Sequence, residues 1–255
     1  MRQRIRRAIV LVSLLCFPVT MNYLSPYVSI AGAASGLFVA SLAMFAAMFV
    51  GSLVLGRLWC GWVCPVAGLS DACTAIQPKP VNLKVLRAVR YVVWALWLGT
   101  LGALLAAAGG FHGVQLLFFT ESGVSVDEPI KYFMYFLVLA LLLALTLTLG
   151  RRGACHAVCW MSPFMELGGA AGRALRLPQL HIAAEEPRCN GCNQCTRHCP
   201  MSIDVKALVP TGGVRSTACI LCGECVDGCK QKALRYGWLG QSATKANTQG
   251  GDLSA

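Results

Sequence analysis

Long apolar runs alternate with short polar stretches over the first two thirds of this 255-residue chain. Four of the runs are long and apolar enough to cross a hydrocarbon core of about 30 Å as helices. They cover residues 8–24, 33–55, 91–111 and 132–149. The pattern predicts a mainly α membrane protein built on a four-transmembrane-helix bundle.

The first run has a second interpretation, because the basic stretch MRQRIRR before it is also typical of a secretory signal peptide. No A-x-A cleavage pattern closes the run, and the chain returns directly into the second apolar run. Both observations favour a retained membrane helix, which Pro18 interrupts near its end.

Composition agrees with a membrane protein. Hydrophobic residues make up 56% of the chain and charged residues only 13%, with a mean hydropathy of +0.60, whereas soluble domains have about 25% charged residues. The net charge of +11 raises the question of nucleic acid, but the basic residues are not gathered into a face with interleaved aromatic residues. We therefore expect membrane lipid and no nucleic acid among the partners.

The distribution of basic residues predicts the orientation. Of the 22 lysine and arginine residues, only Lys131 falls on the far side of the predicted bundle. Loops rich in lysine and arginine stay in the cytoplasm. We expect a multi-pass protein of the cytoplasmic (inner) membrane with its N- and C-termini in the cytoplasm, where thiols stay reduced and disulfides are rare.

Eight of the 14 cysteines lie in two copies of a C-x2-C-x2-C-x3-C pattern, CNGCNQCTRHCP from residue 189 and CILCGECVDGCK from residue 219. This is the ligand spacing of bacterial two-cluster ferredoxins, in which three thiolates of a loop bind one [4Fe–4S] cube and the fourth reaches the other cube. Zinc is the rival metal, but its paired C-x2-C motifs are usually separated by a longer spacer. The predicted ligand sets are Cys189, Cys192, Cys195 and Cys229 for one cluster, and Cys219, Cys222, Cys225 and Cys199 for the other.

Four further cysteines form an internal repeat. The chain reads LGRLWCGWVCP after the second apolar run and LGRRGACHAVCW after the fourth, so Leu-Gly-Arg precedes a C-x3-C pair each time. Positions four apart share one face of a helix, so each pair can present two thiols to one partner. We expect Cys60, Cys64, Cys155 and Cys159 to handle electrons or metal, while the spacing leaves open what they bind. Cys16 and Cys73 are interpreted as small hydrophobic residues.

These motifs together resemble the NapH-type membrane ferredoxins, a family that includes quinol-dehydrogenase subunits and related assembly and regulatory proteins. The resemblance rests on the first C-x3-C motif after a transmembrane hairpin, the second pair after the next hairpin, and the two cysteine loops. It implies four transmembrane helices, cytoplasmic clusters, and electron exchange between the membrane quinone pool and a redox protein partner.

Two classes of function follow. The first is an electron-transfer protein that exchanges electrons with quinone or quinol. The quinol-oxidising subunit of an oxidoreductase complex would be a protein of this class. The alternative is a maturation or regulatory protein that supplies electrons for metal or cofactor assembly of a respiratory enzyme. A quinol site needs a proton acceptor, and His156 is a candidate because an imidazole titrates in the required range; a polar interfacial residue is its other interpretation.

The expected organisation has four regions. A four-helix transmembrane domain with the two C-x3-C motifs covers residues 1–167, and an interfacial linker covers residues 168–187. A small α+β ferredoxin-like module for two [4Fe–4S] clusters follows at residues 188–239. The polar segment at residues 240–255 is expected to be disordered.

Overall fold

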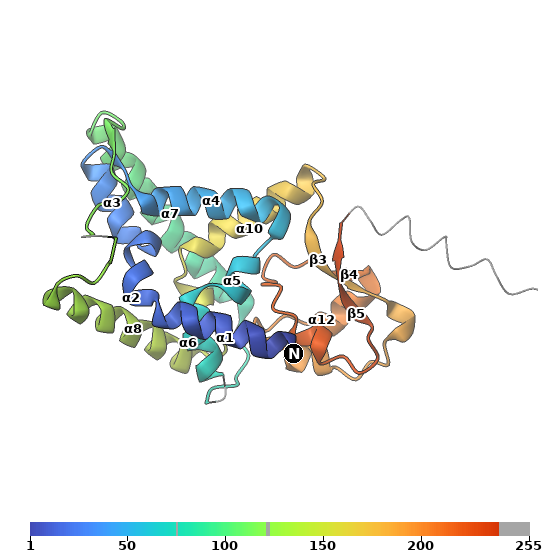
Figure 1. The fold of residues 1–255 in the computed structure, drawn as a ribbon. Helices are drawn as coiled ribbons and strands as arrows, with labels where there is room; N and C mark the ends of the chain where they lie inside the picture. The colour runs from blue at the N-terminus through green and yellow to red at the C-terminus, as the bar shows by residue number, and fades with distance from the viewer. Residues whose placement is uncertain (75, 121–122, 240–255) are drawn as a thin grey trace, which may run out of the picture.

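The computed structural model describes residues 1–74, 76–120 and 123–239, which form a helical body followed by a small α+β module (Figure 1). The predicted disordered tail lies outside the described residues. The body contains α1 (Arg2–Leu15), α2 (Phe17–Thr20), α3 (Pro26–Ala34), α4 (Ala40–Leu55), α5 (Leu58–Trp62), α6 (Pro65–Cys73), α7 (Leu83–Ala107), α8 (Pro129–Leu149), α9 (Gly153–Ala157) and α10 (Met161–Ala174).

Two helices of the described chain are long and apolar enough to cross a membrane, α7 with 25 residues and α8 with 21. At 1.5 Å per residue they measure about 38 and 32 Å, and both exceed the hydrocarbon core of about 30 Å. Helix α4 is apolar but has only 16 residues. The structure therefore contains two of the four long helices that the sequence predicts.

The other two apolar runs are interrupted. In the first apolar run, α1 ends before Cys16 and the short helix α2 follows, with Pro18 in its first turn. Proline cannot donate the backbone hydrogen bond that a continuous helix needs. The second run is divided into α3 and α4 by Gly36, with φ of +63°. Between them, β1 (Leu37–Phe38) pairs in parallel with β2 (Gly113–Val114).

In the first half of the predicted linker at residues 168–187, α10 continues to Ala174 and packs along α4 (Figure 1). Two glycines explain the close packing: a Cβ atom at Gly168 would lie 1.9 Å from the Ser52 hydroxyl, and one at Gly172 would lie 2.1 Å from the Leu53 carbonyl oxygen. Small residues four positions apart let two helices approach closely. The glycine-rich segment is thus part of a helix interface.

The module is organised around β3 (Leu180–Ala184), which starts before the predicted module boundary at residue 188. It pairs antiparallel with β4 (Gly213–Val214) on one side and β5 (Leu234–Trp238) on the other. The remaining elements are α11 (Gln194–Arg197), α12 (Val205–Leu208) and α13 (Glu224–Asp227), with 3-10 turns at Asn22–Leu24 in the body and at Glu186–Arg188 and Val209–Thr211 in the module.

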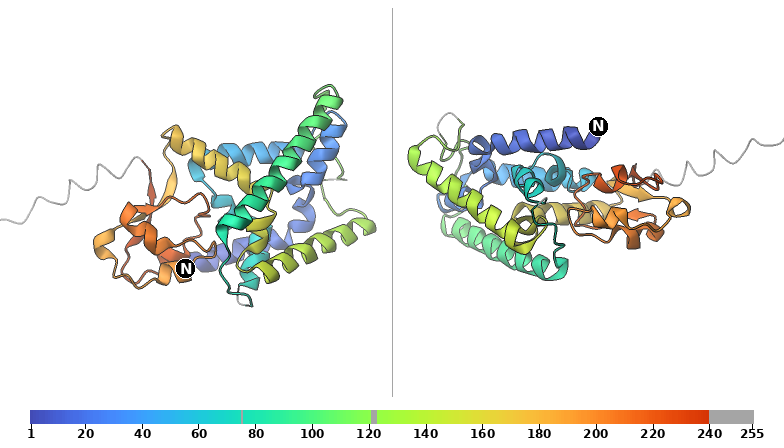
Figure 2. Two further views of the ribbon diagram at one scale, coloured as in Figure 1. Left: turned by 180° about the vertical axis from the view of Figure 1, so that it is seen from behind. Right: turned by 90° about the horizontal axis from the view of Figure 1, so that it is seen from below.

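The N-terminal helix α1 holds the module to the body. Arg2 forms an ion pair with Asp227, and the Gln3 side chain donates to the Cys222 carbonyl oxygen at 3.0 Å. The N-terminus consequently lies beside the module, and α1 and α7 lie on opposite sides of the body when it is seen from below (Figures 1 and 2).

Candidate metal centres

The two cysteine loops of the module have the same backbone shape. Three positions of the repeated motif adopt left-handed backbone in both copies: Gly191, Asn193 and Ser202 in the first loop, and Leu221, Gly223 and Lys232 in the second. Left-handed residues turn the chain sharply, and backbone N–H groups reach the sulfurs, as those of Leu221 and Glu224 do at Cys219 and Cys222. Such donors stabilise thiolates and metal-bound sulfur.

Four cysteines meet around each of two small cavities in the module. One cavity is lined by Cys199, Cys219, Cys222 and Cys225, and the other by Cys189, Cys192, Cys195 and Cys229. These are the two groups that the spacing predicts, with the fourth cysteine of each loop among the three of the other loop. The donor sets fit two [4Fe–4S] cubes, and the assignment of each ligand stays a prediction.

Burial is the largest influence on the pKa of two thiols in the second cysteine loop. It raises the pKa of Cys219 to about 12 and that of Cys222 to about 11, although backbone N–H groups, and Arg152 and Arg6 beside Cys222, act in the opposite direction. A protonated thiol must lose its proton to bind metal. Iron bound at these positions would therefore displace protons from the thiols.

The two C-x3-C pairs converge in the interior of the body, each against the opposite half of the repeat. Cys60 Sγ lies 3.5 Å from Sδ of Met165 on α10, which follows the second pair. Cys155 Sγ lies 4.0 Å from Oγ of Ser70 on α6, which follows the first pair. Met165 and Ser70 occupy equivalent positions, each six residues after the second cysteine of its own pair. The contacts are therefore reciprocal.

The second cysteines lie at the starts of the helices that follow them. The Ala67 N–H group in the first turn of α6 donates to the Cys64 sulfur, and the Ser162 N–H group in the first turn of α10 donates to the Cys159 sulfur. Cys60, Cys155 and Cys159 each act electrostatically on Cys64. Burial raises the pKa of Cys159 to about 12. After burial, the electrostatic effects of Cys155 and Cys60 contribute most to this increase in pKa. The four thiols thus belong to one cluster of side chains.

Two ion pairs cross between the halves in the same reciprocal way. Arg57 donates to Glu166 at 2.9 Å, and Arg152 donates to Asp71 at 2.6 Å. Each arginine stands three residues before the first cysteine of its own half, and each carboxylate stands seven residues after the second cysteine of the other half. The recurrence of an arginine and a carboxylate at these offsets can be seen in the sequence, and the structure shows that each arginine pairs with the carboxylate of the other half.

Glu166 receives three further donors in the interior. Arg90 on α7 donates at 2.6 Å, the Tyr91 hydroxyl at 3.0 Å and the Ser162 hydroxyl at 3.3 Å. Arg57, Arg90 and Glu166 are each only 3% exposed. Charges that are this deeply buried persist only when they are paired.

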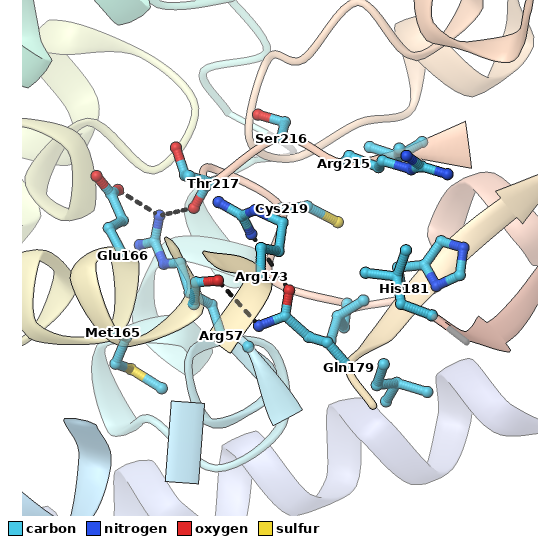
Figure 3. Close-up of a pocket in the computed structure, with 16 residues that line it drawn as sticks. Arg57, Met165, Glu166, Arg173, Gln179, His181, Arg215, Ser216, Thr217 and Cys219 are labelled. Carbon is cyan, nitrogen blue, oxygen red and sulfur yellow. Dashed lines mark hydrogen bonds and ion pairs between the residues drawn. The ribbon is translucent and has the colours of Figure 1, made fainter. Parts of the chain in front are cut away.

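The module rests directly on this part of the body. The Arg57 guanidinium lies between the Glu166 carboxylate and the backbone carbonyl of Thr217, to which it donates at 3.4 Å (Figure 3). Trp62 Nε1 donates to the Leu221 carbonyl oxygen at 3.0 Å. A Cβ atom at Gly61 would lie 2.2 Å from the Ile220 carbonyl oxygen. The second cysteine loop is therefore in contact with the helix that carries Cys60.

His156 is buried beside Cys155, at 3% exposed. Burial and the neighbouring Arg57, Arg90 and Arg152 lower the pKa of His156 to about 3. Its imidazole is neutral at physiological pH and is a poor proton acceptor for a quinol.

Of the other two cysteines, Cys73 is buried and Cys16 is exposed. None of the 14 cysteines, all of which lie in the described residues, forms a disulfide. No group of three or more His, Cys, Asp or Glu side chains in the described ranges is arranged to hold a single metal ion.

Comparison with known proteins assigns 4Fe-4S domains to both regions. The family model described as a 4Fe-4S binding domain matches residues 37–79 and 131–178, the segments that contain the two C-x3-C pairs. The model described as a 4Fe-4S dicluster domain matches residues 188–234. No solved structure matches this chain.

Three curated relatives are 26–29% identical to the chain over the residues that align. YccM of Escherichia coli K12 is 27% identical over 217 residues, 80% of this chain and 57% of YccM. The methylamine utilization ferredoxin-type protein MauN of Methylobacillus flagellatus is 29% identical over 185 residues, 69% of this chain and 60% of MauN. The ferredoxin-type protein NapH of Escherichia coli K12 is 26% identical over 229 residues, 83% of this chain and 74% of NapH. The chain thus spans less than two thirds of the length of YccM and of this MauN.

Proposed function

Because the chain belongs to the NapH-like family of ferredoxin-type 4Fe-4S proteins, we propose that it exchanges electrons between the membrane quinone pool and a redox protein partner. Electron transfer by iron–sulfur clusters is the common ground of this family. The membrane anchor, the quinone and the number of clusters are the specific parts of the proposal.

Exposed apolar side chains support the membrane anchor. Leu96 on α7 and Phe133 on α8 are 68% and 64% exposed, and Leu11 on α1 and Val50 on α4 are 55% and 62% exposed. Large apolar side chains that are more than half exposed on several helices indicate a surface that contacts lipid or another protein. We infer that α1, α4, α7 and α8 all face lipid as the four-helix bundle, with the basic loops and the module in the cytoplasm.

The eight module cysteines would hold two clusters, in the two groups that line the cavities. When bound, each [4Fe–4S] cluster supplies one-electron transfer, so two clusters match the two electrons that a quinol releases. The contact of the second cysteine loop with α5, through Gly61 and Trp62, carries the proposal. This contact supports a short path for electrons between the helical body and the clusters of the module.

A cleft between α1, α6 and the first cysteine loop is our candidate site for the quinone head group. It has a volume of about 780 Å³, and its lining includes Val10 and Leu11 on one side and Arg151, His198 and Pro200 on the other. Pro200 follows the cluster ligand candidate Cys199 directly. The apolar side chains of Val10 and Leu11 suit a prenyl chain, and the charged side chains of Arg6, Arg7 and Glu224 line the same cleft.

The proposal is tested with anaerobically purified protein in lipid nanodiscs. We expect a quinol to bleach the visible absorbance of the clusters, or a quinone to restore it after dithionite reduction. Replacing Leu11 with Trp fills the cleft and should slow this exchange at least tenfold without changing dithionite reduction. Leu15→Trp is the matched control, because Leu15 is 71% exposed on the same helix and does not line the cleft.

Failure of both quinol and quinone to react, with dithionite still reducing the clusters, would overturn the quinone assignment. That outcome would favour the maturation or regulatory alternative, in which the electrons serve assembly of another enzyme.

A further inference from the structure

We propose that an acidic redox protein docks on the module at three exposed lysines beside the first cysteine cavity, the one lined by Cys189, Cys192, Cys195 and Cys229. These lysines are Lys206, Lys230 and Lys232, and we call the surface that they form the outer face. The inference rests on the proposed function and deepens it, because it gives the redox partner a contact surface and a charge.

The two cysteine loops differ in charge at equivalent motif positions. Glu224 and Asp227 of the second loop stand where the first loop has Gln194 and Arg197. Both carboxylates form ion pairs with arginines of α1. The acidic side chains of the second loop are thus used against the helical body, and the first loop has no acid at the same positions.

The segments after the fourth cysteines differ in the same sense. The first loop continues as Pro-Met-Ser at residues 200–202, and the second as Lys-Gln-Lys at residues 230–232. Pro200 and Met201 are buried, and Oγ of Ser202 accepts a hydrogen bond from the Val81 N–H group of the body at 3.2 Å. The Lys-Gln-Lys segment is exposed throughout, and Gln231 lines the first cavity. One copy therefore packs on the body, and the other presents lysines to solvent.

The first cavity is the more accessible of the two. In the described chain, none of its lining residues forms a hydrogen bond or an ion pair with the helical body. In the second loop, by contrast, the Leu221 and Cys222 carbonyl oxygens accept bonds from the body. Cys192 is classed as exposed, unlike the other seven module cysteines, all of which are described. A soluble protein can approach the first cavity without displacing a helix.

Positive charge is left unbalanced at the outer face. Lys206 lines the first cavity, and Lys230 and Lys232 flank Gln231 on its rim. Within the described residues, none of the three lysines forms an ion pair, and each is exposed. Four of the five carboxylates between residues 180 and 239 are engaged elsewhere: Glu224 and Asp227 with α1, Glu185 with Arg188 and Arg235, and Asp204 with the Thr196 hydroxyl and the Ala207 N–H group.

This charge suits an acidic protein. Complementary charge steers two proteins together and fixes how they meet. A [4Fe–4S] cube with four thiolates is itself anionic, so lysines on its rim also offset its repulsion of an acidic partner.

A protein fits the outer face better than a lipid surface does. Strong adsorption to a membrane combines basic side chains with apolar side chains that enter the lipid. Exposed large apolar side chains are frequent on α7 and α8, but none lies within residues 180–239. The lysines therefore have no apolar neighbours of the kind that would anchor them in lipid.

Stopped-flow kinetics of the full-length protein in phosphatidylcholine nanodiscs test the proposal, with oxidised flavodoxin, an acidic electron carrier, as the probe. One electron passes from a reduced cluster to the flavin. We expect Lys206→Gln, Lys230→Gln and Lys232→Gln together to lower the second-order rate at low salt by about tenfold or more. The difference should vanish at 1 M salt, where the Debye length is about 3 Å.

The matched control combines Arg4→Gln, Lys79→Gln and Lys84→Gln, which change the net charge equally at exposed positions of the body. It should keep the rate of the unsubstituted protein. Carbodiimide cross-linking of the unsubstituted protein to flavodoxin gives a readout that needs no electron transfer and no variant. We expect amide bonds to flavodoxin carboxylates at the outer-face lysines.

Three results would overturn the proposal. Equal rates for the two triple variants would remove the outer face as the docking surface. A rate difference that persists at 1 M salt would assign the lysines to the cluster potential instead. Protection of the lysines from acetylation by phosphatidylglycerol nanodiscs, but not by flavodoxin, would assign them to lipid. Each of these results leaves the proposed function standing if quinol still reduces the clusters of the unsubstituted protein, whereas loss of that reaction overturns the quinone assignment alone.

Discussion

Glu166 is the residue at which the interlocked halves can be tested most sharply. We expect Glu166→Gln to lower the stability of the protein strongly, because it leaves Arg57 and Arg90 charged and 97% buried without a carboxylate; both arginines and Glu166 are only 3% exposed. Removing one member of a buried ion pair costs about 3–5 kcal/mol. For a chain of this size 1 kcal/mol corresponds to roughly 2–4 °C in Tm, so the expected fall is roughly 6–20 °C.

The measurement is thermal unfolding of the anaerobic holoprotein in detergent, with iron content determined before each scan. Asp227→Asn is the control, because the Arg2–Asp227 pair is 33% and 34% exposed and a pair of this kind contributes about 0–1 kcal/mol. Arg57→Met combined with Glu166→Gln should cost less than the sum of the two single changes, by roughly 0.5–3 kcal/mol. Equal Tm values for Glu166→Gln and Asp227→Asn would refute the claim that Glu166 neutralises the buried arginines.

Three further predictions concern docking, ligation and topology. Gly61→Ala should strain the contact between α5 and the second cysteine loop by roughly 1–3 kcal/mol and make the module more sensitive to protease. Gly51→Ala on α4 is the control, because a Cβ atom there meets nothing within 4 Å. Equal cleavage of both variants would contradict the docking of the module on α5. Crosswise ligation predicts that Cys199→Ser perturbs the same EPR signal as Cys219→Ser, and Cys229→Ser the same signal as Cys189→Ser, so the reverse grouping would disprove our ligand sets. Reporter fusions after Val28, Pro80, Thr120 and Ala170 should alternate outside, inside, outside, inside, and a periplasmic signal after Ala170 would exclude a cytoplasmic module.

The cysteine loops were predictable because their chemistry is local. Three thiolates that bind one cube follow one another within a few residues, so the ligand spacing from Cys189 to Cys199 can be recognised in the sequence alone. The exchange of the fourth cysteine between loops follows from the same pattern, and Cys199 and Cys229 indeed line the opposite cavities.

The helix boundaries were harder to predict because hydropathy does not register backbone breaks. Pro18 and Gly36 lie inside runs that are apolar throughout, and each divides its run into two helices. Gly168 and Gly172 fall in the segment predicted as an interfacial linker, and in the structure they bring α10 close to α4. The meaning of a glycine depends on its neighbour in space, which a single sequence does not provide.

The pairing of Arg57 with Glu166 joins positions 109 residues apart, beyond any helical or strand period. The internal repeat contained the necessary signal, since an arginine and a carboxylate recur at fixed offsets around both C-x3-C pairs. What the repeat alone leaves open is whether each arginine pairs within its own half or with the other half.

The reciprocal ion pairs also impose an order on assembly. Arg57 is synthesised long before its carboxylate partner Glu166, whereas Asp71 already has Arg6 as a partner in the first half before Arg152 is synthesised. A chain interrupted between α6 and α9 would hold two thiols and an arginine with no partners. Burial of such a charge is strongly unfavourable, so the first half stays open until the second half arrives. A chain that ends before Glu166 therefore leaves the Arg57 guanidinium without its carboxylate partner, and the first half cannot bury that charge favourably until the second half is present.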